Sequence, residues 1–138
     1  MDNDEARRFA SRWEADWNSG DLDRILALYA DDVVFESPNI AQWFGDPTGE
    51  VRGKQALREY WSAGLARRPG LQFSVVEVRV AVGTIVLDYV TEPGGPRVAE
   101  VLKLRDGLVV SGCGCYPIAE AGSAAAPRSE PEGEEPAQ

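Results

Sequence analysis

A period-two pattern of apolar residues over residues 73–116 constrains the fold of this chain more than any other feature. Such alternation is typical of half-buried β-strands, and the breaks that contain Gly and Pro are typical of turns. The pattern predicts four long strands, joined by short turns into one antiparallel sheet, over residues 73–82, 84–92, 97–105 and 108–116. The apolar face of such a sheet must be buried against other elements.

One carboxyl interrupts this apolar face. Glu100 stands between Val98 and Leu102, where the alternation predicts an inward-pointing apolar side chain. If residues 94–95 form a two-residue loop, Tyr89 lies opposite Glu100. Buried carboxyls are costly unless they are protonated or hydrogen-bonded, and perturbed acids often mark functional sites. Glu100 is therefore either the proton-transfer group of a pocket or a core carboxyl satisfied by a partner such as Tyr89.

The first predicted hairpin extends the same inward face. A Gly83-Thr84 turn pairs Val78 with Tyr89, and Leu87 then lies opposite Val80. In this register one strand contributes four inward valines: Val76, Val78, Val80 and Val82.

The last strand has two possible registers. A two-residue Asp106-Gly107 loop places Cys113 opposite Glu100, whereas a three-residue loop places Gly112 there. We favour the longer loop because it turns a suitable set of residues inward: Leu108, Val110, Gly112, Gly114 and Tyr116. Two glycines on one face predict a bulge or a hollow that a bulky ligand could fill.

The residues before the sheet begin with two predicted helices. Phe9, Trp13 and Trp17 recur at helical spacing and predict an amphipathic helix over residues 4–18. Asp21 is a suitable N-cap for a second helix that ends before Asp31.

A short strand, a loop and a third helix follow. Residues 33–36, which include Phe35, predict a strand that ends at Ser37-Pro38. The Gly-, Pro- and Asp-rich residues 38–52 also carry Trp43, which predicts a loop packed over an apolar surface and a candidate lid. Residues 54–67 predict a third helix with Tyr60 and Trp61 on its apolar side.

Composition limits the classes of function. At 138 residues the chain suits one domain, predicted here as residues 1–118, and residues 119–138 predict a disordered acidic tail. The formal charge is −9, of which −4 lies in residues 120–138. Without a basic stripe, we expect no nucleic-acid binding. Without an apolar leader or a run of about 18 apolar residues, we expect no membrane span and a cytoplasmic protein.

The chain contains no histidine and two cysteines. The commonest metal ligand and the usual base of a nucleophilic triad are therefore missing, and we expect no metal and no cofactor. Cys113 and Cys115 lie about 6.6 Å apart along a strand, near the upper limit for a disulfide, so we expect free thiols.

Several segments resemble the nuclear transport factor 2-like superfamily, whose members are also called SnoaL-like. The resemblance rests on WNSGDLD at residues 17–23, LYADDVVF at 28–35, GKQALREY at 53–60 and LRDG at 104–107. It implies an α+β cone fold of the cystatin-like class, with three N-terminal helices and a curved antiparallel sheet over about residues 5–117. A fold of this kind hosts enzymes of many types and plain binding domains.

The chain is most similar to ketosteroid isomerases within that superfamily. The resemblance places Trp13 and Trp61 where the isomerases have tyrosines, and Ser37 where they have the catalytic base. Glu100 falls on their protonated aspartate. Because serine cannot replace the base at neutral pH, steroid isomerisation by that mechanism is not expected.

The sequence predicts a cofactor-independent isomerase, polyketide-type cyclase or lyase that acts on a hydrophobic carbonyl-containing small molecule. Glu100 is the predicted catalytic residue. The alternative is a non-catalytic domain for small-molecule binding or dimerisation, and a homodimer through the outer face of the sheet is expected in either case. The predicted lining of the pocket is Trp13, Trp17, Phe35, Ser37, Trp43, Tyr60, Trp61, Val78, Tyr89, Val98, Leu102, Gly112, Gly114 and Tyr116.

Overall fold

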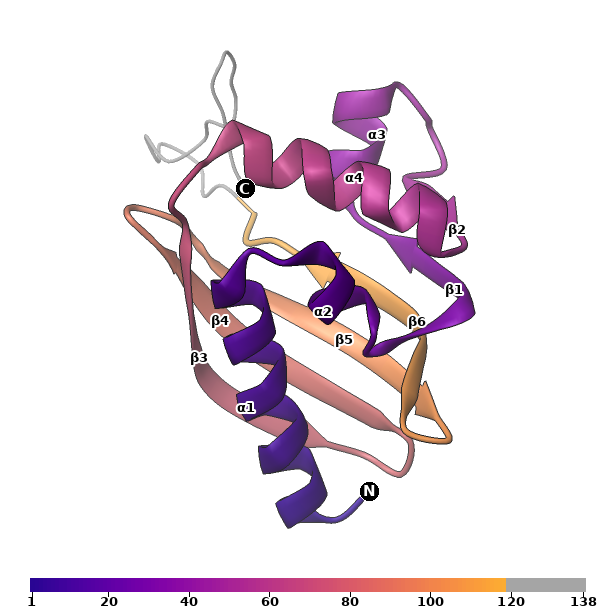
Figure 1. The fold of residues 1–138 in the computed structure, drawn as a ribbon, viewed down its shortest axis with the longest axis vertical. Coiled ribbons are helices and arrows are strands. Elements are labelled where there is room, and N and C mark those ends of the chain that lie inside the picture. Colours follow the sequence, from indigo (N-terminus) through magenta and orange to yellow (C-terminus); the bar gives the residue numbers. More distant parts are fainter. Residues whose placement is uncertain (119–138) are drawn as a thin grey trace.

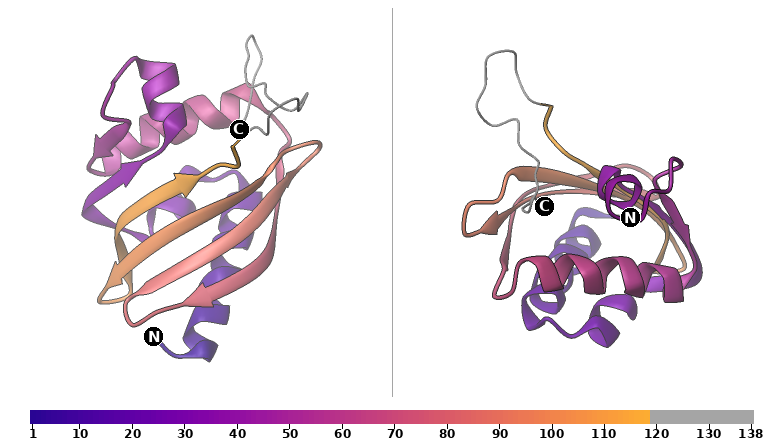
Figure 2. Two further views of the ribbon diagram at one scale, coloured as in Figure 1. Left: turned by 180° about the vertical axis from the view of Figure 1, so that it is seen from behind. Right: turned by 90° about the horizontal axis from the view of Figure 1, so that it is seen from above.

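The computed structural model describes residues 1–118, and the predicted tail of residues 119–138 lies outside them. A strongly curved six-stranded sheet wraps around helices on its concave side (Figures 1 and 2). The strand order is β2-β1-β6-β5-β4-β3, and only the β1–β6 pair is parallel. The α+β fold class predicted from the sequence is confirmed. The strands are β1 (Tyr29–Glu36), β2 (Glu50–Arg52), β3 (Gln72–Val80), β4 (Thr84–Glu92), β5 (Arg97–Arg105) and β6 (Leu108–Cys115).

Helix α1 (Asn3–Ser19) lies across the concave face of the sheet over β3 and β4 (Figure 1). It begins with a capping box, in which Asp2 accepts from the Glu5 backbone N–H and Glu5 accepts from that of Asp2. Gly20 ends it in the left-handed conformation. The helix buries one face, made of Ala6, Ala10, Trp13, Asp16 and Trp17.

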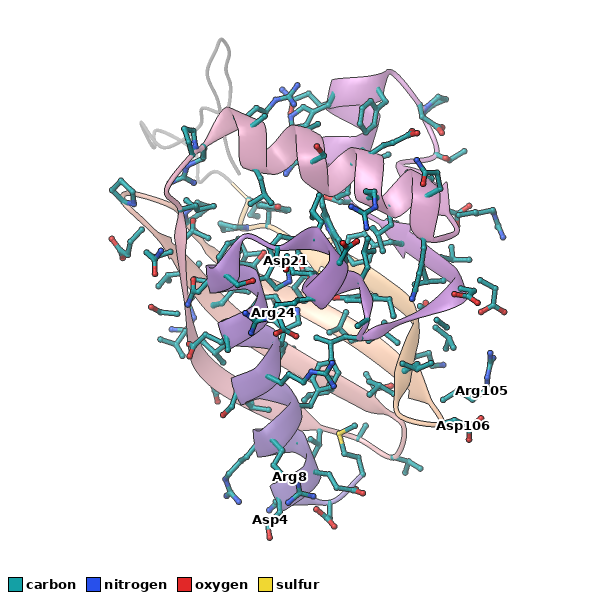
Figure 3. All side chains as sticks on the ribbon, in the orientation of Figure 1. Asp4, Arg8, Asp21, Arg24, Arg105 and Asp106 are labelled. Atoms are coloured by element: carbon teal, nitrogen blue, oxygen red, sulfur yellow. The ribbon has the colours of Figure 1, made fainter. Side chains whose placement is uncertain are left out.

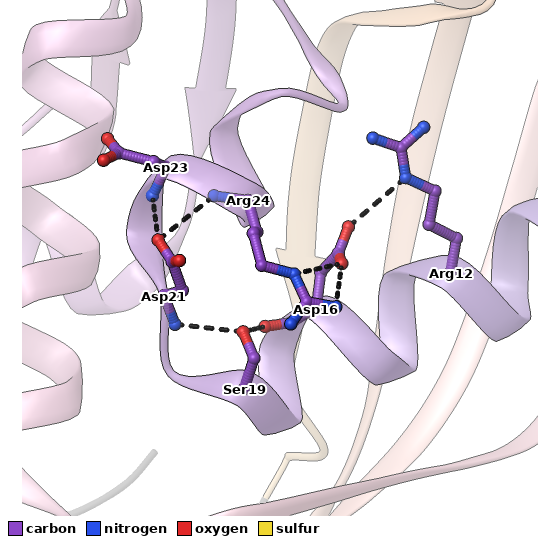
Figure 4. A network of polar contacts seen from close by, with 6 residues as sticks. All are labelled: Arg12, Asp16, Ser19, Asp21, Asp23 and Arg24. Atoms are coloured by element: carbon purple, nitrogen blue, oxygen red, sulfur yellow. Dashed lines mark hydrogen bonds and ion pairs between the residues drawn. The ribbon is translucent and has the colours of Figure 1, made fainter.

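A polar network fixes the turn from α1 into α2 (Leu22–Leu26) (Figure 4). Asp16 is buried and accepts two bonds from Arg24, at 3.2 Å from Nε and 3.0 Å from a terminal nitrogen, and its other oxygen lies 3.4 Å from Arg12 Nε. Asp21 accepts from the backbone N–H groups of Asp23 and Arg24 and so caps α2. This helix is shorter than predicted, because Tyr29 already belongs to β1.

The segment between β1 and the long helix α4 (Lys54–Arg67) was predicted as a loop, and this prediction is wrong. It forms α3 (Pro38–Phe44) and β2, which pairs with β1. Ser37 caps α3 by accepting from the Asn39 backbone N–H, Pro38 occupies the first turn, and Ile40 is fully buried. The segment is therefore docked on the core by regular structure. The predicted α4 boundaries are confirmed.

The predicted register of β4 and β5 is wrong by two residues. Glu100 lies opposite Leu87, and Tyr89 lies opposite Val98. The connection is longer than a two-residue loop, since the last pair is Val90 with Arg97. A shift of two keeps every side chain on its face, so Glu100 still points inward.

The register of β3 is also wrong, for two reasons. The turn between β3 and β4 is longer than two residues, so Val80 pairs with Ile85 and Val78 with Leu87. A bulge at Val76 then shifts the register by one more residue, so that Val75 pairs with Tyr89. Val76 is 54% exposed and Val82, in the turn, is 94% exposed, so neither joins the inward face as predicted.

The β5–β6 hairpin combines parts of both predicted registers. Asp106 and Gly107 form a two-residue loop with positive φ angles, at the end of the hairpin where Figure 3 labels Arg105 and Asp106. A bulge at Val110 then shifts the register by one residue. Val109, rather than the predicted Leu108 and Val110, is buried, and the two glycines face inward with Gly112 opposite Leu102 and Gly114 opposite Glu100.

Gly112 is not a hollow for a ligand, because core side chains fill the space beside it. A Cβ there would lie 2.8 Å from Leu102 Cδ2 and 2.9 Å from Phe35 Cδ1, both in fully buried side chains. We expect Gly112→Ala to lower the free energy of unfolding by about 1–3 kcal/mol through overpacking, measured by chemical denaturation. Gly114→Ala is the control, since its Cβ would meet neighbours at 3.5 Å or more. Equal stability of Gly112→Ala and the wild type would contradict this packing.

Candidate functional site

A pocket opens between the concave face of the sheet and helices α1, α3 and α4. The space in and in front of it is about 680 Å³ with open solvent included. Its lining combines many aromatic residues with few polar groups: Trp13, Trp17, Phe35, Asn39, Trp43, Tyr60, Trp61, Gly64, Leu65, Arg68, Leu71, Phe73, Tyr89, Thr91, Val98, Glu100 and Tyr116.

All four tryptophans of the chain line this pocket. Their rings pack edge to face or tilted, with centroids 4.9 Å apart for Trp17 and Trp61 and 5.0 Å apart for Trp13 and Tyr89. The indole Nε1 atoms of Trp13 and Trp17 are buried and have no hydrogen-bond partner among the described residues. The wall is therefore apolar and rigid, yet it contains unused donors.

Glu100 reaches the pocket from the middle of β5 and is only 8% exposed. The Tyr89 hydroxyl donates to its Oε2 at 3.3 Å, a long bond, and its Oε1 has no partner among the described residues. Burial raises the pKa of Glu100 to about 8, and the Tyr89 bond offsets only part of this. At neutral pH Glu100 is thus mostly a neutral carboxylic acid that can donate a hydrogen bond.

Hydroxyl groups surround the same side of the pocket. The Tyr60 hydroxyl donates to Ser37 Oγ at 3.0 Å, and Asn39 Nδ2 donates to the Tyr116 hydroxyl at 3.0 Å. Burial raises the pKa of Tyr60 to about 12 and holds the pKa values of Tyr89 and Tyr116 well above the usual range. These phenols therefore stay neutral. Tyr116 accepts from Asn39 and contributes a neutral hydroxyl to this side of the pocket.

Arg68 is half-buried and lines the pocket just after the end of α4. Its guanidinium donates to Thr91 Oγ1 at 3.3 Å and to the Pro93 carbonyl, and burial lowers the pKa of this guanidinium. The preceding Arg67 instead bonds the Ala63 carbonyl and stacks on Trp43 at 4.1 Å. The two arginines therefore have different surroundings.

Most of the predicted lining residues do meet at this pocket, and five lie elsewhere. Ser37 is buried and accepts from the Tyr60 hydroxyl. Leu102 and Gly112 lie opposite each other in the core. Val78, on β3, lies opposite Leu87 of β4. Gly114 is close behind Glu100, since a Cβ there would lie 3.6 Å from Oε2. The lining residues that the sequence reasoning missed are Asn39, Gly64, Leu65, Arg68, Leu71, Phe73 and Thr91.

The residues missed by sequence reasoning gave weak signals. Asn39 sits in a segment predicted as a loop, and Arg67-Arg68 before Pro69-Gly70 resembles an ordinary basic helix end. Phe73 points inward only because the bulge in β3 reverses the alternation before Val76, whereas Thr91 continues the inward face of β4 two residues after Tyr89. Among the described residues, no group of three His, Cys, Asp or Glu side chains could hold a metal ion, and no helix is long and apolar enough to cross a membrane.

Comparison with known proteins identifies the family. The SnoaL-like domain matches residues 10–112 of this chain. The chain belongs to the SnoaL-like family. A SnoaL-like protein of unknown function from Burkholderia thailandensis is 32% identical, with a TM-score of 0.80 over 85% of this chain and 98% of that one. Among curated proteins, none matches this chain.

Two more distant structures share the SnoaL-like fold. TerC, crystallised together with polyporic acid, is 16% identical over 82% of this chain and 92% of that one, with a TM-score of 0.68. IdmH from Streptomyces antibioticus, described as a candidate polyketide cyclase, is 20% identical over 79% of this chain and 89% of that one, with a TM-score of 0.64. At these identities the likeness concerns the fold alone.

The raised pKa of Glu100 predicts an unusual pH dependence of stability. The folded protein holds this proton more tightly, with a pKa of about 8, than an unfolded chain, in which Glu titrates near ~4.3. Tighter binding of this proton by the folded protein stabilises it fully below pH ~4.3. This stabilisation is lost as the pH rises toward the pKa of Glu100 in the folded state. Relative to Glu100→Gln, the wild type should lose up to about 1.4 kcal/mol of unfolding free energy per pH unit in this window. Parallel pH profiles from urea denaturation would contradict this environment for Glu100.

Proposed function

We propose that this SnoaL-like protein is a cofactor-independent isomerase, cyclase or lyase that acts on a hydrophobic carbonyl-containing small molecule. The observation that carries the proposal is Glu100, a buried acid on the wall of an aromatic pocket with one oxygen unpaired. Burial raises its pKa to about 8, close to the pH at which a proton-transfer group works best. A carboxyl needed only for packing would have its hydrogen-bonding capacity satisfied.

Glu100 acts first as a hydrogen-bond donor in this mechanism. A substrate carbonyl beside the Glu100 carboxyl accepts a hydrogen bond from it, which stabilises the negative charge that develops on oxygen as a neighbouring C–H bond breaks. Tyr116, a neutral phenol that lines the pocket, is the candidate for a second hydrogen bond to a substrate oxygen. The aromatic wall excludes water and strengthens both interactions.

Glu100 is the only carboxyl on the pocket wall among the described residues, and the chain contains no histidine. No second side chain there is basic enough to remove a proton at neutral pH, because the phenols stay protonated. The one carboxyl must then give its proton to the carbonyl oxygen and take the proton of the C–H bond, which leaves an enol and returns Glu100 to its acid form. This exchange is easiest when the C–H bond is acidic. A carbon between two carbonyl groups meets this requirement, which favours the chemistry of polyketide-like substrates.

The second candidate function is non-catalytic binding of the same class of small molecule. The Tyr89 hydroxyl bond to Glu100 favours it, because it shows that the carboxyl has at least one structural partner. The fold comparisons support a small-molecule pocket under both candidates, since TerC was crystallised with polyporic acid.

Proton exchange separates the two candidates. We expect the wild type to accelerate the exchange of protons for deuterium next to the carbonyl in a panel of aromatic 1,3-diketones, followed by proton NMR in D₂O. Glu100→Gln should remove about two orders of magnitude of this rate, the usual loss for a general acid or base. Glu77→Gln, which changes an exposed carboxylate on β3, is the matched control. Binding of the diketones without any acceleration would favour the non-catalytic candidate.

A homodimer through the outer face of the sheet is part of the proposal. Across β4, β5 and β6, this face carries a row of half-buried apolar side chains in which Val86 pairs with Val101 and Val101 with Cys113. The neighbouring thiol of Cys115 is exposed, and both cysteines are free. A second copy would cover this row and remove its apolar area from water.

Light scattering tests the dimer. The wild type should have the mass of two chains at micromolar concentration, and Val101→Glu should have the mass of one, because a buried unpaired charge at the centre of the interface is costly. Arg7→Glu, on the exposed side of α1, is the control for a change of charge. A wild-type protein with the mass of one chain would rule out this interface.

A further inference from the structure

We propose that Arg68 is a specificity residue and that the substrate carries a carboxylate, which this guanidinium binds while the carbonyl group reaches Glu100. This inference rests on the proposed function, because it describes the other end of the same ligand. Arg68 and Glu100 both line the pocket, from the end of α4 and from the middle of β5.

The hydrogen bonds of Arg68 hold it in place and leave donors unused. A guanidinium has five N–H donors, and the described bonds from Arg68 go to Thr91 Oγ1 and to the Pro93 carbonyl. Both acceptors are neutral groups, one at the end of β4 and one just after it. The side chain is therefore positioned before a ligand binds, and ligand binding loses less side-chain entropy than it would with a mobile arginine.

The charge of Arg68 is not balanced within the described residues. Most other arginines there pair with carboxylates, as Arg24 does with Asp16 at 3.0 Å and Arg97 with Asp88 at 3.2 Å. Arg68 makes no ion pair with a described carboxylate, and it differs from the unpaired Arg8 and Arg67 in that it lines the pocket. Partial burial of the guanidinium lowers its pKa, which reflects the cost of keeping this cation away from water. An anionic group on the ligand would offset that cost through charge-assisted hydrogen bonds.

A role for Arg68 in stabilising the end of α4 does not explain its position. Arg67 already performs that role, since it bonds the Ala63 carbonyl within the last turns of the helix. Arg68 instead turns toward the sheet, where Thr91 is 5% exposed. The remainder of the chain carries a net negative charge. A local cation on the pocket wall is therefore needed if an anion is to approach the pocket.

The difference in burial between the charged groups of the pocket defines the ligand class. Arg68 is a half-buried cation, aromatic rings form the wall, and Glu100 is a buried neutral acid. This arrangement fits an aromatic keto acid, with its carboxylate outward, its rings along the tryptophans and its ketone inward. A carboxylate placed next to Glu100 would instead be buried without a cation, at a high cost.

A matched pair of probes tests the proposal: 6-acetyl-2-naphthoate and its methyl ester, which share rings and ketone but differ in charge. Binding is measured at pH 6.5 from the shifts of the tryptophan indole N–H signals in ¹H–¹⁵N NMR spectra, since all four indoles line the pocket. The wild type should bind the acid more tightly than the ester. Arg68→Gln should weaken binding of the acid by about tenfold or more, the size of a charge-assisted contact, and leave the ester within about threefold.

Two further variants keep the test decisive. Arg68→Lys preserves the charge and should recover part of the affinity for the acid, and Arg79→Gln, which removes an exposed arginine from the outer face of β3, should leave both affinities unchanged. Equal affinity of the wild type for acid and ester would overturn the proposal. The proposal would also be overturned if Arg68→Gln binds the acid as tightly as the wild type while its NMR spectrum shows that it is folded.

The same titrations in Glu100→Gln distinguish this proposal from the catalytic one. Preference for the acid should persist in that variant, because the carboxylate contact does not involve Glu100. Selective binding of the acid without proton exchange would remove the catalytic function and support the carboxylate contact of Arg68. Proton exchange without selectivity for the acid would overturn the proposed contact of Arg68 alone. Failure of both probes to bind would overturn that contact and the proposed pocket together.

Discussion

The structure of this site depends on one unfavourable interaction, the burial of the Glu100 carboxyl among aromatic rings. Burial of an ionised carboxylate in such surroundings would cost far more free energy than one hydrogen bond from Tyr89 provides. The protein avoids that cost by keeping the proton, which is the physical meaning of a pKa of about 8. A folded chain that contains this acid is consequently less stable at high pH, and buried groups with shifted pKa values of this kind cluster at functional sites.

The rest of the fold keeps water away from this group. Helix α1 supplies Trp13 and Trp17 from one side, α4 supplies Tyr60 and Trp61 from another, and the curved sheet forms the floor (Figure 2). Curvature allows a sheet to line a cavity, and the bulges in β3 and β6 contribute to it. The docked α3 then brings Asn39 and the cap Ser37 to the tyrosine hydroxyls, so that the polar side of the pocket is set by local structure.

Much of this arrangement could be predicted from the sequence, because period-two alternation sets the face of each residue independently of the exact register. The predicted register of β4 with β5 is wrong by two residues, yet Glu100 points inward in both, as only parity matters. A bulge moves the residues beyond it to the opposite faces of the sheet, and no residue type predicts where a bulge forms. Val76 and Val110 are ordinary valines, so the errors in β3 and β6 arose at these positions.

The polar residues of the site were harder to predict than the aromatic ones. Trp13 and Trp17 recur at helical spacing, and this identifies a buried face. Asn39 and Arg68 lie in a short helix and just after a long one, where their sequence neighbours say nothing about a pocket. Their positions follow from tertiary contacts with Tyr116 and Thr91, which are 77 and 23 residues away in sequence.

Infrared difference spectroscopy of the wild type against Glu100→Gln at pH 7 tests the central claim most directly. The claim is that Glu100 is a neutral acid in contact with the ligand pocket. We predict a carbonyl stretching band of a neutral carboxylic acid that is present only in the wild type and that shifts when 6-acetyl-2-naphthoate is added. A carboxylate band in its place, or a carboxylic acid band that the bound probe does not move, would contradict the account.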